Sequence, residues 1–294
     1  MPTIHSRVAS ARERLLRAGV SEDDAGLEAR LLAQFALGWN AVRFLADARR
    51  ADSPQFAAQY DALVERRLRR EPLAYITGEQ EFWNLPFDVS PAVLIPRPET
   101  EGIVEAALKE FHDAGARLRI ADVCTGSGCL AVALARERVN AAIIAADISA
   151  AALAVARQNA ARHAVADRIQ FTETNLLDGI DGPFDLIVAN PPYVRDVDRA
   201  SLQPEVRDYE PALALFAGDD GLDVIRALLQ QTPSRLAPGG VLMFEFGFGQ
   251  SEAVRELIAN THGLTLTSIE KDLQGIDRIA VVLSTRKSAE QRGA

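Results

Sequence analysis

An asparagine, two prolines and a tyrosine follow a mostly apolar segment at residues 184–189. They are Asn190, Pro191, Pro192 and Tyr193. Prolines lack an N–H group and have a fixed φ, so they stiffen the backbone and leave its carbonyl oxygens available. The side-chain oxygen of Asn190 and the main-chain oxygen of Pro191 can together accept both hydrogens of a planar NH₂ group. Tyr193 can stack on the amide or base that carries this group. The segment therefore predicts a rigid acceptor site with Pro192 in its wall.

A glycine-containing turn earlier in the chain could hold a nucleotide. It comprises Cys124, Thr125, Gly126, Ser127 and Gly128. Gly126 and Gly128 allow a sharp turn with room for a ligand, and the N–H groups of the following helix are available to that ligand. Asp147 ends the next expected strand roughly 20 residues later, where a carboxylate can accept both hydroxyls of a ribose.

Two kinds of cofactor satisfy this turn. The spacing of Gly126, Gly128 and Ala131 matches the dinucleotide fingerprint, so a nicotinamide-dependent oxidoreductase is one hypothesis. S-adenosylmethionine, whose ribose would bind the same acid, is the other. The glycine pattern alone does not separate them.

The acceptor site favours the second hypothesis, because hydride transfer has no use for it. An amide nitrogen is a poor nucleophile, since its lone pair is delocalised. Accepting both of its N–H groups fixes its plane, favours a lone pair that faces the methyl donor, and compensates the positive charge that develops on nitrogen. Proximity and electrostatics can then drive an in-line methyl displacement without a strong general base.

Alternating strand and helix patterns predict the elements that position these residues. We expect strands at 118–123, 141–147, 168–172, 184–189, 240–246, 264–270 and 277–284, and helices at 99–113, 128–138, 150–163, 219–236 and 250–261. Such alternation predicts an α/β fold with a mostly parallel sheet covered on both faces. A short turn joins the last two strands, so they should form an antiparallel hairpin.

The remainder divides into three further segments. Residues 1–72 predict a small helical bundle, with Ser21 as a helix cap and glycines at positions 19 and 38 as helix ends. The arginine-rich run at 66–70 is expected on a solvated face at a helix C-terminus. Residues 73–98 suggest a β-hairpin linker, with strands around 75–77 and 81–89, and residues 285–294 suggest a loose polar tail.

The segment 194–216 is long enough to form a lid over the site.

Composition limits the remaining function classes. The chain has 294 residues, of which 48% are hydrophobic and 25% charged, as in ordinary globular proteins of about two domains. No segment approaches the ~20 apolar residues of a membrane span, and no signal peptide is evident. Two cysteines indicate a reducing compartment, hence the cytoplasm, and four scattered histidines predict no metal site. Residues 73–294 carry a net charge of −11, so no large basic surface for nucleic acid is expected.

Several motifs resemble those of the protein glutamine-N5 methyltransferase family, closest to its release factor branch (the HemK/PrmC type). The matching stretches are 74–78, 82–83, 94–101, 125–128, 190–193, 204–211 and 219–222. The resemblance implies a class I, Rossmann-like S-adenosylmethionine methyltransferase domain at 99–284. It also implies that 1–72 recognises the partner. A related branch, which methylates a ribosomal protein, usually has Ser after the Pro-Arg of the linker, whereas Pro98 follows Arg97 here.

The resemblance also implies a substrate and its site. The substrate would be the glutamine of the Gly-Gly-Gln motif in bacterial class I release factors. The clamp would be formed by Asn190, Pro191, Pro192 and Tyr193, and the cofactor would be held by Cys124–Gly128, Asp147, Asn175, Leu176 and Asn190. Two positions depart from the family pattern: Cys124 replaces a usual glycine, and Asn175-Leu176 replaces an acid followed by an aromatic residue. A ribosomal-protein glutamine, nucleic-acid adenine and a nicotinamide cofactor remain alternative targets or ligands.

Overall fold

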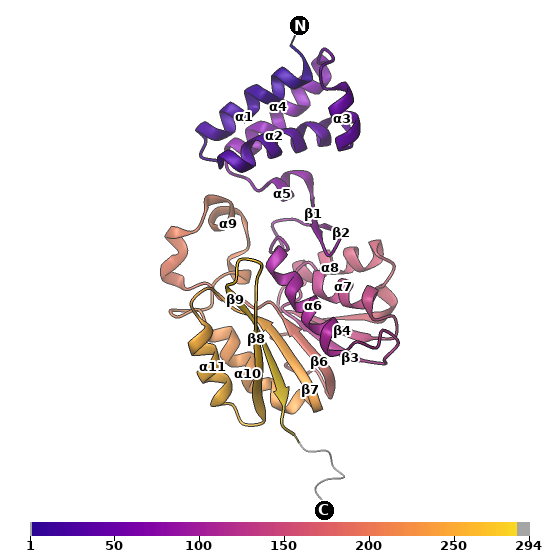
Figure 1. Cartoon of the computed structure of the whole chain (residues 1–294), viewed down its shortest axis with the longest axis vertical. Coiled ribbons are helices and arrows are strands. Elements are labelled where there is room, and N and C mark those ends of the chain that lie inside the picture. Colours follow the sequence, from indigo (N-terminus) through magenta and orange to yellow (C-terminus); the bar gives the residue numbers. More distant parts are fainter. Residues whose placement is uncertain (1, 287–294) are drawn as a thin grey trace, which may run out of the picture. The chain divides into compact units, whose positions relative to one another are not determined.

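The computed structural model describes residues 2–286 and divides the chain into two units (Figure 1). The helical unit comprises the chain up to Glu79 together with Gln203–Tyr209. The sheet unit comprises Gln80–Leu202 and the chain from Glu210 onward. The tail expected at 285–294 lies almost entirely outside the described residues.

The helical unit contains six helices among the described residues. They are α1 (Ile4–Arg17), α2 (Glu22–Leu37), α3 (Ala41–Asp47), α4 (Pro54–Leu68), α5 (Leu73–Thr77) and α9 (Pro204–Tyr209). The Ser21 side chain caps α2 by accepting from the N–H of Asp24, and Gly38 ends it with a φ of 63°. Leu15, Leu32 and Tyr60 are fully buried in the core of this unit.

Two parts of the helical unit differ from the sequence-based expectation. Residues 73–77 form α5 rather than a strand, because Pro72 at the N-cap and Gly78 at the C-cap, with a φ of 78°, bound a single helical turn. Arg67 is buried, with 4% exposure, instead of lying on a solvated face. Its guanidinium is paired with Glu28 and Glu205, which satisfies a charge that burial would otherwise penalise.

A two-stranded hairpin follows. Its strands are β1 (Glu79–Phe82) and β2 (Leu85–Asp88). Trp83 and Asn84 between them both have positive φ, 54° and 55°, as a tight type I′ turn requires. The segment expected as one strand around 81–89 therefore contains the turn and parts of both strands.

A seven-stranded sheet forms the centre of the sheet unit, in the order β5-β4-β3-β6-β7-β9-β8. The strands are β3 (Arg119–Val123), β4 (Ala142–Asp147), β5 (Ile169–Glu173), β6 (Phe184–Ala189), β7 (Leu236–Glu245), β8 (Leu264–Lys271) and β9 (Asp277–Ser284). Strands β3 to β7 are parallel, whereas β9 pairs antiparallel with both β7 and β8. The mostly parallel sheet with a C-terminal antiparallel hairpin is therefore confirmed.

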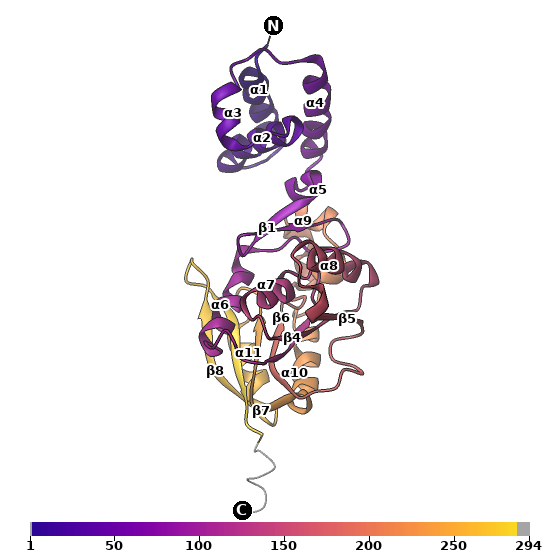
Figure 2. The ribbon, with the colours of Figure 1, turned by 90° about the vertical axis from the view of Figure 1, so that its right-hand side faces the viewer.

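Helices cover both faces of this sheet (Figures 1 and 2). One apolar core joins it to α6 (Glu101–Glu110), α7 (Cys129–Glu137) and α8 (Ala150–Arg162). A second core joins the opposite face to α10 (Asp223–Arg235) and α11 (Ser251–Ala259). Helix α10 begins later than expected, because Gly221 has a φ of 74° and the Asp220 side chain accepts from the N–H of Leu222.

Short 3₁₀ turns complete the unit: η1 (Pro98–Thr100), η2 (Ala166–Arg168), η3 (Asp196–Ser201) and η4 (Ala212–Ala214). Within residues 2–286, no helix has the length and apolar character to cross a bilayer.

Candidate active site

The carboxyl ends of four adjacent strands lie level with one another. Val123 of β3 pairs with Ala146 of β4 and with Ala189 of β6, and Ala189 pairs with Phe244 of β7. The residues that directly follow these paired positions are Cys124, Asp147, Asn190 and Glu245. The chain order reverses between β3 and β6, and open α/β sheets bind ligands outside such a reversal.

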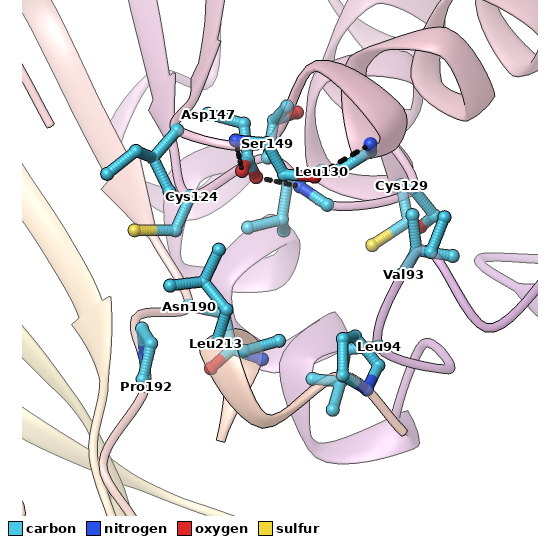
Figure 3. A pocket seen from close by; sticks show the side chains of 18 of the residues that line it. Val93, Leu94, Cys124, Cys129, Leu130, Asp147, Ser149, Asn190, Pro192 and Leu213 are labelled. Carbon is cyan, nitrogen blue, oxygen red and sulfur yellow. Dashed lines mark hydrogen bonds between the residues drawn. The ribbon is translucent and has the colours of Figure 1, made fainter. Parts of the chain in front are cut away.

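A cavity of about 180 Å³ occupies this position. Of the residues expected in the site, those that line it are Cys124, Thr125, Gly126, Ser127, Asp147, Asn175, Leu176, Asn190 and Pro192. Figure 3 shows Cys124, Asn190 and Pro192 on one side of the cavity and Cys129, Val93 and Leu94 on the other. Gly128, Pro191 and Tyr193 are not among the lining residues.

The glycine turn is built from left-handed backbone. Gly126 and Gly128 have φ of 54° and 80°. A Cβ added to Gly128 would lie 3.0 Å from that of Ala156, so this glycine permits close packing of α7 on α8. A Cβ on Gly126 would meet no atom within 4 Å, and since Gly126 lines the cavity, its bare backbone leaves space for a ligand.

Cys124 and Leu176, which depart from the family pattern, also have left-handed backbone conformations. Cys124 has a φ of 60° and Leu176 a φ of 54°. Glycine adopts this conformation without steric cost, whereas a residue with a Cβ is strained by about 1–2 kcal/mol. Cys124 therefore places strain directly beside the cavity.

Asp147 is anchored by the backbone around it (Figure 3). Its Oδ2 accepts from the N–H of Gly126 at 2.9 Å, and its Oδ1 accepts from the N–H of Ser149 at 2.9 Å. Burial raises the pKa of Asp147, and these hydrogen bonds oppose the rise. Each carboxylate oxygen keeps acceptor capacity for a further donor, as two ribose hydroxyls would require.

A second acid, Asp122, is fully buried and holds the glycine turn through hydrogen bonds. Asp122 Oδ2 accepts from the Thr125 hydroxyl at 2.6 Å and from the N–H of Ala131 at 3.0 Å. Its Oδ1 has no hydrogen-bond partner among the described residues. Burial raises the pKa of Asp122 to about 7, although both hydrogen bonds lower it.

Asn190 and Tyr193 belong to one hydrogen-bonded network with side chains from two further segments, Thr100 of η1 and Glu245 of β7. Asn190 Nδ2 donates to Thr100 Oγ1 at 2.9 Å, and Thr100 Oγ1 donates to Glu245 Oε2 at 2.7 Å. The Tyr193 hydroxyl donates to Glu245 Oε1 at 2.8 Å. Burial raises the pKa of Glu245, and the bonds from Thr100 and Tyr193 oppose that rise.

These hydrogen bonds give Tyr193 a partner, Glu245, that the sequence does not predict. Thr100 and Glu245 themselves had no expected role in the site. The pairing of Ala189 with Phe244 is what places Glu245 level with Asn190, and no local sequence pattern encodes that pairing.

The linker forms the remaining wall. Arg97 lines the cavity and forms an ion pair with Glu210, whose Oε2 also accepts from the N–H of Ile95 at 3.2 Å. Burial raises the pKa of Glu210, and the Arg97 guanidinium opposes that rise. Pro211, Leu213 and Ala214 also line the cavity, so part of the long segment expected as a lid does border the site.

Comparisons with known proteins give sequence relatives and a solved structure of the same fold. Family models for the PrmC N-terminal domain and the methyltransferase small domain match residues 8–78 and 104–204. A release factor glutamine methyltransferase of Geobacter sulfurreducens is 44% identical over 87% of this chain and 89% of its own length. One of Bradyrhizobium diazoefficiens is 40% identical over 97% of both chains. A solved methyltransferase structure from Pyrococcus furiosus shares the fold, with a TM-score of 0.51 and 15% identity over 76% of this chain and 99% of that one.

Proposed function

The chain belongs to the release factor glutamine methyltransferase family, and we propose that it methylates the side-chain nitrogen of the glutamine in the Gly-Gly-Gln motif of bacterial class I release factors. The methyl donor is S-adenosylmethionine, and the reaction takes place in the cytoplasm, where translation terminates. The observation that carries this proposal is the orientation of Asn190. Its Nδ2 is bonded to Thr100, so its Oδ1 is the atom left to accept a substrate N–H.

The cavity fits the methyl donor. Asp147 provides acceptors for the ribose hydroxyls, and the bare backbone of Gly126 leaves room beside the turn. Asn175 and Leu176 line the region for the adenine, and Leu176 packs more weakly there than an aromatic side chain would. When bound, S-adenosylmethionine would supply an electrophilic methyl group on its sulfonium. The glutamine nitrogen would bond this methyl group and lose one proton to solvent, and S-adenosylhomocysteine would leave.

The residues at the end of β6 act on the glutamine. Asn190 Oδ1 and the carbonyl oxygen of Pro191 accept its two N–H groups and hold the amide plane fixed. Pro191 and Pro192 are buried and lack N–H groups, so this backbone resists rearrangement. The acceptors compensate the positive charge that develops on nitrogen, a contribution of the kind made by preorganised dipoles in other transferases.

Charge favours a protein target over nucleic acid. The net charge of residues 73–294 is −11, and a phosphate backbone would be repelled by a surface of that sign. A ribosomal-protein glutamine presents the same amide to the clamp and is the alternative that the test must separate.

The test is methylation of purified release factor by this protein with S-adenosylmethionine, measured by intact mass. We expect a gain of about 14 Da, one methyl group replacing one hydrogen, and a loss of rate of roughly 10²–10³-fold in Asn190→Ala. Asn260→Ala, at an exposed asparagine that ends α11, is the matched control and should retain the rate. No mass gain on release factor, with a gain on ribosomal protein instead, would overturn the proposed substrate.

A further inference from the structure

Thr100 ends η1 and directly precedes α6, with helical backbone angles of φ −67° and ψ −21°. Side-chain capping is typical of residues with extended angles, so the Thr100 hydroxyl is free for other partners. Here no side-chain cap bond forms, and the Thr100 hydroxyl is directed at Glu245 and Asn190 instead. Thr100 is 2% exposed, so its hydroxyl is shielded from bulk water and depends on these two partners.

With Glu245 ionised, and so able only to accept, the hydrogens available fix the direction of each hydrogen bond in this network. A threonine hydroxyl has one hydrogen, and Thr100 gives it to Glu245 Oε2. Its oxygen can then only accept from the group on its other side, which must present an N–H. Asn190 therefore turns its Nδ2 toward Thr100 and its Oδ1 away from it.

We propose that Glu245 and Thr100 are positioning residues that hold the Asn190 amide with its oxygen, rather than its nitrogen, toward the substrate. The proposal rests on the proposed function, since it assigns how the same clamp selects its substrate. Glu245 can fix these side chains because it is 1% exposed and each of its oxygens accepts a hydroxyl hydrogen, one from Thr100 and one from Tyr193.

A turned Asn190 amide would weaken the selectivity of the clamp. With Oδ1 forward, the clamp presents two acceptors, Asn190 Oδ1 and the Pro191 carbonyl oxygen, which suit an NH₂ group and repel a carboxylate. With Nδ2 forward, it presents one donor and one acceptor, so a carboxylate is repelled less and the glutamine nitrogen is no longer held by both of its hydrogens. The orientation of one amide thus separates glutamine from glutamate.

Thr100→Val tests this directly, because valine has the shape of threonine without its hydroxyl. We expect kcat to fall by roughly 10–100-fold, as when residues that orient a reacting side chain are removed. The Kd for S-adenosylmethionine should stay within about twofold of the wild-type value. Binding of a release factor with Gly-Gly-Glu, relative to Gly-Gly-Gln, should rise by about tenfold, the scale of one good hydrogen bond.

Two controls isolate the effect of orientation. Thr100→Ser keeps the hydroxyl and should restore both kcat and the Gln-over-Glu preference. Thr232→Val removes an equally buried hydroxyl, which bonds Leu228 O in α10, and should change neither. If Glu245 acts through Thr100, adding Glu245→Gln to Thr100→Val should leave the preference of the single variant unchanged.

The outcomes separate this inference from the proposed function. Wild-type methylation of release factor tests the function. If that reaction occurs and Thr100→Val keeps the wild-type kcat and Gln-over-Glu preference, the positioning role is overturned and the function stands. A preference that Thr100→Ser does not restore would also overturn it, because the hydroxyl would then not be the active feature.

Discussion

Cys124 shows how one residue can hold strain at a binding site. It follows β3 directly, lines the cavity, and has a φ of 60°. A side chain in this region costs free energy that only the surrounding structure can offset, and such residues are common at functional sites. The resemblance identifies glycine as the usual residue here, and the backbone conformation supplies the physical reason.

Relief of this strain is measurable. Cys124→Gly and Cys124→Ala both remove the sulfur, but only glycine removes the Cβ. We expect the glycine variant to exceed the alanine variant in free energy of unfolding by about 1 kcal/mol. Urea denaturation monitored by circular dichroism gives both values. Equal stabilities would show that the left-handed backbone carries no cost at this position.

The turn between β3 and α7 depends on a buried acid that does not line the cavity. Asp122 holds Thr125 and the first turn of α7, and one of its oxygens lacks a protein partner among the described residues. Burial disfavours its charged form and raises its pKa to about 7, against about 3.9 in an unfolded chain. Between these values the folded state keeps a proton that the unfolded state has lost.

Stability should therefore fall as the pH rises. The contribution of Asp122 is greatest below pH 4, declines by about 1.4 kcal/mol per pH unit as the unfolded carboxyl loses its proton first, and levels above pH 7. In Asp122→Asn this decline should be absent, so the difference in free energy of unfolding between wild type and variant should shrink from pH 5 to pH 7 and then stay constant. Exposed Asp167→Asn is the control. A difference that does not vary with pH would contradict the raised pKa.

Sequence patterns predicted the long elements and missed the short ones, for a physical reason. Strands β3, β4 and β6 are apolar and end at turn residues, and the sequence predicts their bounds to within one residue. Strand β7 begins four residues before its expected start at 240. Residues 73–77 contain Tyr, Ile and Thr, which favour strands, yet the boundaries at Pro72 and Gly78 decide for a helix. Five residues are too few for a side-chain pattern to override the proline and glycine that bound the segment.

Site residues divide in the same way. Asp147 and Asn190 each end an apolar strand, so the sequence alone placed them. Thr100 in η1 and Glu245 at the end of β7 are 145 positions apart, and no local pattern encodes their hydrogen bond. Their contact depends on tertiary structure, and for that reason the sequence did not reveal it.

At the scale of the whole molecule, the chain contributes to the helical unit twice. Helix α9 belongs to this unit although both neighbouring segments belong to the sheet unit. Glu205 of α9 pairs with Arg67 at 2.8 Å and with Arg70 at 2.6 Å, and the Tyr209 hydroxyl donates to Arg69 O. These contacts make the arginine-rich run a structural feature rather than a solvated face.

Loss of the Glu205 charge should destabilise this unit. Glu205→Gln leaves Arg70 without its carboxylate and buried Arg67 with Glu28 alone, and we expect a loss of about 1–3 kcal/mol. Asp208→Asn on the same helix removes the partner of Arg207 in an exposed pair, which solvent screens, and should lower Tm far less. Thermal unfolding followed by calorimetry compares them. Equal shifts in Tm for the two variants would show that the buried pair contributes no more than the exposed one.

The central claim is that this site transfers a methyl group to a glutamine side-chain nitrogen in release factor. The most direct measurement is a single reaction containing labelled S-adenosylmethionine, release factor, ribosomal protein and an adenine-containing oligonucleotide, followed by tandem mass spectrometry of each. We predict label on the glutamine of the Gly-Gly-Gln peptide and none elsewhere, with loss of that label in Asn190→Ala. Label on the oligonucleotide, on the ribosomal protein alone, or on a different residue of release factor would contradict the account.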